Sequence, residues 1–199
     1  MCRIDPIERC PYCFTHDFNR EVEKCCKNCL KKRRSTDKIA SVFDYEGPAA
    51  TLIKSLKYGG QDYLAKGAGA FLAAQYLTLG WPMPDAVIPM PIALLRRWER
   101  GYNQSYLLAE SFASLLNIPV KDILIRKSGH FSQAGLSYEQ RIQLSSDAFD
   151  IRKGADIMNQ NVVIIDDVMT TGTSIECCAE ALQSLFPKAI YGLTVCRAI

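Results

Sequence analysis

The sequence lacks the long apolar run that a membrane-spanning helix requires. Such a helix needs about 20 consecutive apolar residues, and no stretch of this chain approaches that length. The segment Met1–Pro6 also lacks the apolar core of a secretory signal peptide. We therefore expect no membrane insertion. Because the nine cysteines occur without an export signal, we also expect a cytoplasmic, reducing location.

A strong net charge is missing as well. The 24 Lys and Arg residues against 21 Asp and Glu residues give a net charge of +3, which is too small to indicate a nucleic-acid-binding protein by itself. The excess positive charge belongs to the N-terminal 38 residues. The length of 199 residues and a hydrophobic content of 48% predict one domain with an ample core plus a small appendage.

Two Cys-x-x-Cys motifs with twelve residues between them occupy the appendage. Paired motifs of this kind place four sulfurs around one tetrahedral ion, and zinc favours thiolates. A segment this short buries little core, so metal binding would supply most of its folding energy. We predict a structural zinc ribbon, with a redox dithiol or an iron–sulfur site as the alternative. The predicted ligands are Cys10, Cys13, Cys26 and Cys29.

Some assignments in the appendage stay open. Cys25 could replace Cys26 as a ligand, although the Cys-x-x-Cys spacing favours Cys26. A basic run follows, and it is either a solvated linker or a contact to the phosphates of a nucleic acid. The run comprises Lys31, Lys32, Arg33 and Arg34. We expect residues 1–38 to form the ribbon and linker, and residues 39–199 to form the main domain.

The most informative segment is Val162–Ser174. It opens with four apolar β-formers that do not alternate with polar residues, which predicts a strand buried on both faces of a parallel sheet. Asp166 and Asp167 follow, where open α/β sheets bind ligands. The hydroxyl-rich loop Thr170–Ser174 then leads into a predicted helix, whose N-terminus favours an anion. The pattern predicts a sugar-phosphate site, with an ordinary acidic turn as the alternative.

Three arginines follow the apolar segment Ala86–Pro91. They are Arg96, Arg97 and Arg100. Guanidinium groups bind phosphate with two parallel hydrogen bonds, so the arginines form a second candidate anion site. The alternative is a solvated helix face.

Local patterns also predict several other elements. The expected strands are Ile39–Tyr45, Ile123–Arg126 and Ala189–Cys196. The expected helices are Asp62–Leu79, Ser105–Leu116, Tyr138–Ser146 and Ser174–Phe186, with a further helix opening at Gly47. We expect Gly67 and Gly69 to allow close helix packing.

The segment Val162–Ser174 resembles the phosphoribosyl pyrophosphate (PRPP) motif of type I phosphoribosyltransferases. In that family the two acids contact the ribose hydroxyls and the loop holds the 5′-phosphate of Mg²⁺-bound PRPP. The resemblance implies an α/β fold with a parallel sheet flanked by helices, and phosphoribosyl transfer to an acceptor that the sequence does not identify. The acids would be catalytic. The implied PRPP-binding residues are Asp166, Asp167, Val168, Met169, Thr170, Thr171, Gly172, Thr173 and Ser174.

Nearly the whole chain resembles the ComF/GntX family of phosphoribosyltransferase-like proteins. Its blocks occur here in order: the cysteine motifs, Leu52–Tyr58, Ile88–Gln104, Arg126–Arg141 and the PRPP motif. The resemblance adds Met90, Pro91, Arg97, Arg100 and Arg141 to the expected PRPP site.

This second resemblance implies a role in natural transformation. The protein would handle imported single-stranded DNA in the cytoplasm, beside a helicase-like competence protein, with the basic run as its nucleic-acid contact. Two alternatives stay open. One is a phosphoribosyltransferase of nucleotide or related metabolism, and the other is a non-catalytic PRPP sensor that docks a protein partner.

Overall fold

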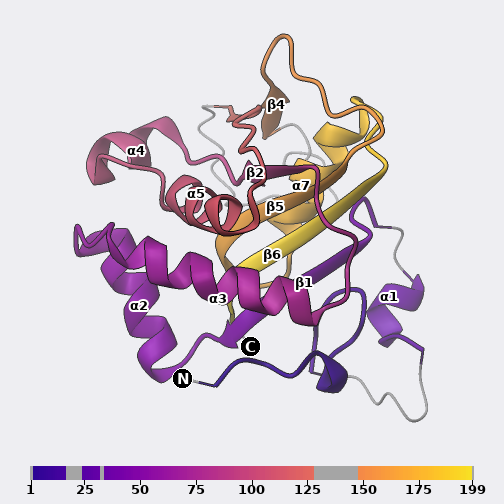
Figure 1. The fold of residues 1–199 in the computed structure, drawn as a ribbon, viewed down its shortest axis with the longest axis horizontal. Coiled ribbons are helices and arrows are strands. Elements are labelled where there is room, and N and C mark those ends of the chain that lie inside the picture. The colour runs from indigo at the N-terminus through magenta and orange to yellow at the C-terminus, as the bar shows by residue number, and fades with distance from the viewer. Residues whose placement is uncertain (1, 17–23, 32–33, 128–147, 199) are drawn as a thin grey trace, which may run out of the picture.

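A four-stranded sheet runs through the centre of the structure, which is a computed structural model describing residues 2–16, 24–31, 34–127 and 148–198 (Figure 1). The strand order is β1-β6-β5-β2, and every neighbouring pair is parallel. The strands are β1 (Lys38–Asp44), β2 (Ala86–Pro89), β5 (Asn161–Met169) and β6 (Ala189–Arg197). A separate antiparallel pair is formed by β3 (Leu124–Arg126) and β4 (Phe149–Ile151).

Helices cover both faces of the parallel sheet. In Figure 1, α3 and α5 cross the near face and α7 lies behind the sheet. The helices are η1 (Pro6–Glu8), α1 (Lys27–Lys31), α2 (Gly47–Tyr58), α3 (Leu64–Thr78), α4 (Leu94–Arg100), α5 (Gln104–Leu116) and α7 (Thr173–Gln183). Within the described parts of the chain, none of these helices is long and apolar enough to cross a membrane.

The apolar residues of β5 alternate between two cores. Val163 and Ile165 pack with α3 and α5 on one face, whereas Val162 and Ile164 pack with α7 on the other. All four side chains are fully buried. The strand therefore needs apolar residues at consecutive positions, as expected for a parallel sheet covered on both sides.

The strand that carries the acids is longer than predicted. β5 continues through Asp166 and Asp167 to Met169, because β6 pairs with it along this whole length, up to Met169 opposite Arg197. The short elements α1, α4 and β4 were not predicted. The predicted helix Tyr138–Ser146 lies outside the described residues.

The N-terminal segment packs against the sheet edge at β1. The backbone N–H of Ile4 donates to the Val42 carbonyl at 2.8 Å, and the N–H of Ile39 donates to the Tyr12 carbonyl at 2.8 Å. Phe14 is buried in the core shared with α3 and α5. We call the described residues 2–16 and 24–31 the cysteine module, and its close packing on β1 fixes where it lies relative to the sheet.

Candidate functional site

Asp166 lies near the carboxyl end of β5, where the start of α5 approaches it. Its Oδ1 accepts hydrogen bonds from the Ser105 hydroxyl at 2.9 Å and from the backbone N–H of Asp167 at 2.8 Å. Asn103 caps α5 by accepting from the N–H of Ser105, and its amide donates to the Met90 carbonyl. These bonds hold the end of β2 and the start of α5 against the acid.

Asp167 is held by two side chains from different helices. Lys57 of α2 places its Nζ 3.0 Å from Oδ1, and Gln104 of α5 donates from Nε2 to Oδ2 at 2.8 Å. The Asp167 side chain is only 5% exposed. The Gln104 Oε1 is buried and has no hydrogen-bond partner among the described residues. It is therefore available to accept a hydrogen bond from a ligand in the pocket.

The two acids differ in their electrostatic environment. Burial, together with the neighbouring charge of Asp167, raises the pKa of Asp166 to about 7. A carboxyl with such a pKa changes its charge near neutral pH. Asp166 can therefore exchange a proton under the conditions in which it would meet a ligand.

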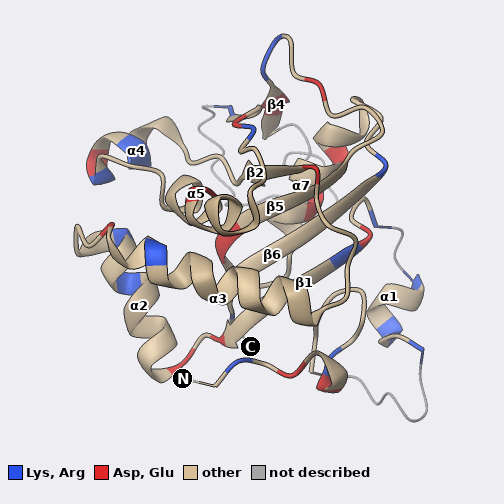
Figure 2. Ribbon diagram, in the orientation of Figure 1, with Lys and Arg blue, Asp and Glu red and all other residues tan. Residues whose placement is uncertain are grey.

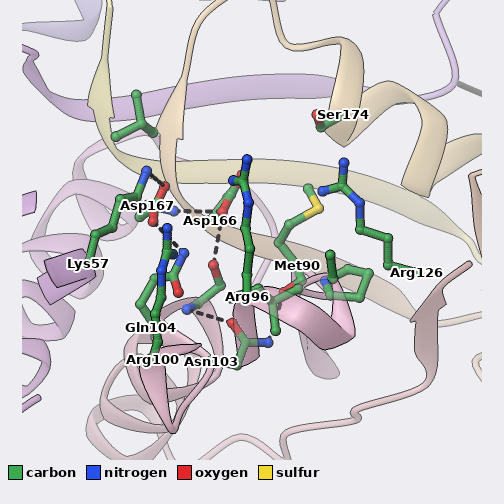
Figure 3. Close-up of a pocket in the computed structure, with 15 residues that line it drawn as sticks. Lys57, Met90, Arg96, Arg100, Asn103, Gln104, Arg126, Asp166, Asp167 and Ser174 are labelled. Carbon is green, nitrogen blue, oxygen red and sulfur yellow. Dashed lines mark hydrogen bonds and ion pairs between the residues drawn. The ribbon is translucent and has the colours of Figure 1, made fainter. Parts of the chain in front are cut away.

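A pocket of about 180 Å³ opens beside the two acids. Arg96 and Arg100 reach into it from α4, and Arg126 lies across from them at the end of β3, near Ser174 (Figure 3). Met90 and Pro91 form part of its wall. Figure 2 shows the acidic end of β5 facing basic segments of α2 and α4. Because Lys57 and three arginines surround two carboxylates, the pocket suits a ligand with several negative charges.

Of the three arginines of the candidate anion site, Arg96 and Arg100 line the pocket and Arg97 does not. Arg100 lines it, and its guanidinium also lies over the ring of Tyr58 at 5.1 Å. Arg97 lies on the exposed surface of α4 and is not among the pocket residues. Arg96 takes that place, because residues four apart share a helix face. Of the other expected site residues, Arg141 lies outside the described residues.

The predicted phosphate loop, Thr170–Ser174, follows β5, and its last two residues form the start of α7. Gly172 has a φ of +79° and caps the helix, a conformation that glycine adopts without strain. Ser174 lines the pocket of the acids, whereas Thr170, Thr171 and Thr173 line a second pocket of about 660 Å³ beside the cysteine module. The hydroxyls of Thr171 and Thr173 lie 2.8 Å apart. Val168 also lines the acid pocket, and Met169 is buried beneath the loop.

The four predicted metal ligands come together in the cysteine module. Their Sγ atoms all lie within 4.8 Å of one another, with Cys10 and Cys29 at 4.0 Å and Cys13 and Cys26 at 3.6 Å. A tetrahedral zinc ion with Zn–S bonds of about 2.3 Å separates its sulfurs by about 3.8 Å. The donor set therefore fits a closed, structural zinc site, and it contains Cys26, not Cys25.

The charges around the sulfurs agree with that assignment. A hydrogen bond from the Cys13 thiol and one from the backbone N–H of Cys26 help to lower the pKa of Cys10 to about 4. The hydrogen bond to Cys10 and burial raise the pKa of Cys13. The sulfurs thus compete for protons that a metal ion would displace.

Arg34, the last residue of the basic run, binds the cysteine module to the phosphate-loop helix. Its guanidinium forms an ion pair with Glu176 of α7 at 2.7 Å and donates to the Cys29 sulfur at 3.4 Å. Glu176 also accepts from the N–H of Ser35 at 2.8 Å. Lys31 is exposed at the end of α1, and Lys32 and Arg33 lie outside the described residues.

Comparison with known proteins gives three findings. Residues 103–198 match the family of phosphoribosyl transferase domains. The chain is 31% identical over 182 residues to Competence protein F of Haemophilus influenzae, covering 87% of this chain and 78% of that protein. It is 28% identical over 195 residues to the DNA utilization protein YhgH of Escherichia coli K12, covering 96% of this chain and 84% of that protein.

A purine phosphoribosyltransferase from Pyrococcus horikoshii aligns with a TM-score of 0.42 at 20% identity, over 66% of this chain and 84% of that chain. The domain match at 103–198 contains Gln104, both acids and the phosphate loop.

Proposed function

The chain belongs to the ComF family, and from this membership and the geometry of its pocket we propose that it binds Mg²⁺–PRPP and acts in DNA uptake. One observation carries the PRPP part. Two acids at the end of β5 face three arginines across a pocket that adjoins the phosphate loop. This combination provides acceptors for vicinal hydroxyls and donors for phosphates at the same place.

Each part of PRPP has a matching group in the pocket. The ribose hydroxyls donate to Asp166 and to the unpaired Oε1 of Gln104. Arg96, Arg100 and Arg126 hold the pyrophosphate, and the phosphate loop holds the 5′-phosphate. Mg²⁺ supplied with the ligand neutralises part of its charge. When a nucleophile attacks C1 of the ribose, the C1–O bond breaks and the arginines stabilise the departing pyrophosphate.

Calorimetry of Mg²⁺–PRPP binding to the full, zinc-loaded chain tests this part. The double variant Asp166→Asn/Asp167→Asn should lose binding. Arg96→Gln and Arg97→Gln form a matched pair on α4, because only Arg96 lines the pocket. We expect Arg96→Gln to weaken binding about tenfold or more, as for a lost charge-assisted contact to phosphate. No binding by well-folded native protein would refute the proposal.

The role in DNA uptake is supported by the names of the two relatives. One is a competence protein and the other a DNA utilization protein. We propose that the chain handles imported single strands in the cytoplasm, next to a helicase-like partner. Native protein should then bind a single-stranded oligonucleotide at low salt and release it as salt rises. Absence of binding at low salt would remove this part of the proposal.

Turnover distinguishes a transferase from a PRPP sensor. A transferase releases pyrophosphate from PRPP when bases, amines or nucleotides are offered as acceptors. A sensor binds PRPP without releasing pyrophosphate and changes its affinity for a protein partner. Both roles require the pocket to bind PRPP, so pyrophosphate release, and not binding, decides between them.

A further inference from the structure

The last turn of α2 contacts the end of α4 through the residues on either side of Lys57. The Leu56 carbonyl accepts a hydrogen bond from the Tyr102 hydroxyl at 2.7 Å. The Tyr58 ring lies under the guanidinium of Arg100, whose carbon Cζ is 5.1 Å from the ring centroid. Because Lys57 itself pairs with an acid of β5, one turn of helix joins the acid side of the pocket to its arginine side.

The position of α4 depends on such contacts, because the helix has little packing of its own. All seven of its residues are described, and none of them is buried. Six are exposed, including the large apolar side chains of Leu94, Leu95 and Trp98. The exception is Arg100, which is half-buried. A helix with so few buried contacts is held mainly where its ends meet other elements.

The contact with Tyr58 leaves the charge of Arg100 available to a ligand. The guanidinium forms no ion pair with any residue that the structure describes, although two acids line the same pocket. An aromatic ring attracts a cation through the negative charge of its face, at a distance of up to about 6 Å. The ring can therefore hold the guanidinium in place without using any of the N–H donors that bind phosphate.

A second arginine of the pocket lies on a ring in the same manner. Arg126 of β3 lies over Phe149, its pairing partner on β4, with Cζ 5.7 Å from the ring centroid. Figure 3 shows Arg126 across the pocket from Arg100. Phe149 is buried in the core, so its replacement would also disturb packing, whereas Tyr58 is 77% exposed. Tyr58 is thus the position at which the effect of a ring can be separated from stability.

We propose that Tyr58 is a positioning residue of the acid pocket, whose ring holds the Arg100 guanidinium where the pyrophosphate of PRPP binds. The inference rests on the proposed function, because it takes PRPP as the ligand. A mobile arginine loses side-chain entropy when it binds an anion. A ring that restricts the arginine beforehand lowers this cost. Tyr58 therefore favours binding without contacting the ligand.

Three substitutions separate the ring of Tyr58 from the rest of the side chain. Calorimetry with the zinc-loaded full chain measures the affinity for Mg²⁺–PRPP. Tyr58→Leu removes the ring and should weaken binding about threefold, the factor expected for an exposed cation–π contact. Tyr58→Phe keeps the ring and should stay within about 1.5-fold of native. Tyr63→Leu is the matched control and should also stay there, because Tyr63 is 68% exposed and no described guanidinium lies over its ring.

Arg100→Gln shows whether Tyr58 acts through Arg100. In that variant no cation lies over the ring, so adding Tyr58→Leu should change the PRPP affinity less than about 1.5-fold. A further threefold loss would overturn the proposal, because the ring would then act by another route. Equal losses in Tyr58→Phe and Tyr58→Leu would overturn it as well, because the ring would not be the cause.

Failure of the proposed function gives a different result. If well-folded, zinc-loaded native protein bound no Mg²⁺–PRPP, the PRPP site and this inference would both fall. If native protein and Tyr63→Leu bound Mg²⁺–PRPP and Tyr58→Leu bound it equally well, the PRPP site would stand and only the role of Tyr58 would fall.

Discussion

Asp166 has an environment that differs from that of an ordinary surface acid. It is enclosed by β2, β5 and α5, and its ionised form also faces the charge of Asp167. The structure therefore maintains a carboxyl at a free-energy cost, which is typical of functional sites. The carboxylate of Asp167, in contrast, is held by Lys57 and Gln104. The two adjacent acids, which are the same residue type, thus have different surroundings.

Replacing Asp166 should reveal that cost as a function of pH. Its folded-state pKa of about 7 lies above the unfolded value near 3.8, so the folded protein binds more protons between these values. The contribution of Asp166 to stability therefore falls as pH rises from about 4 to about 7. Asp166→Asn should match native stability below pH 4. It should exceed native stability by about 2–4 kcal/mol at pH 8, since one pKa unit corresponds to about 1.4 kcal/mol.

Urea denaturation at intervals from pH 4 to pH 8 measures this difference. Asp150→Asn serves as the control, because it removes the same charge from a side chain that is 62% exposed, where solvent screens the charge and a small stability difference is expected. A gain for Asp166→Asn that is the same at every pH would contradict the raised pKa.

At the scale of elements, α3 and α5 depend on a close approach at one glycine. A Cβ built on Gly69 would overlap the side chain of Ser111 and lie 3.0 Å from the backbone nitrogen of Phe112. Gly67, two residues earlier on α3, would have no atom within 4 Å of an added Cβ. The expectation of close packing is therefore confirmed for Gly69 and wrong for Gly67.

Alanine substitutions at the two glycines should have opposite signs. Gly69→Ala should destabilise the protein by about 1–3 kcal/mol, because α5 must shift to accommodate the methyl group. Gly67→Ala should stabilise it by about 0.5–1 kcal/mol, because alanine favours the helix and meets free space. Thermal and urea unfolding of the two variants measure the difference. Shifts of the same sign would show that helix propensity, and not packing, governs both positions.

Elements and site residues that depend on local patterns were predictable. Short segments of the sequence contain the parallel strand, the acids, the phosphate loop and the four cysteines. In each segment the residue types and their spacing indicate the structure or the ligand. Lys57, Gln104 and Arg126 were not assigned to the site because α2, α5 and β3 bring them to Asp167 and the pocket from distant positions. The spacing of four between Arg96 and Arg100 is the local signal that would have separated these two arginines from Arg97.

At the scale of the whole molecule, the cysteine module and the phosphate loop form one connected structure. Arg34 joins the Cys29 sulfur to Glu176 on the helix that follows the loop. Arg197, at the end of β6, donates to the Cys13 carbonyl at 2.7 Å. The metal site is thus supported by the same strands and helix that position the loop, so a disturbance of one should reach the other.

Glu176→Gln tests that connection. It leaves the partly buried Arg34 without its charged partner, since the two side chains are 17% and 15% exposed, and should cost about 1–3 kcal/mol of stability. It should also speed zinc transfer to a chelator, because Arg34 then holds Cys29 and the linker less firmly. Glu180→Gln, four residues along α7 and exposed, should change neither quantity. Zinc release at the native rate from a destabilised Glu176→Gln protein would mean that the module holds its metal independently of the phosphate-loop helix.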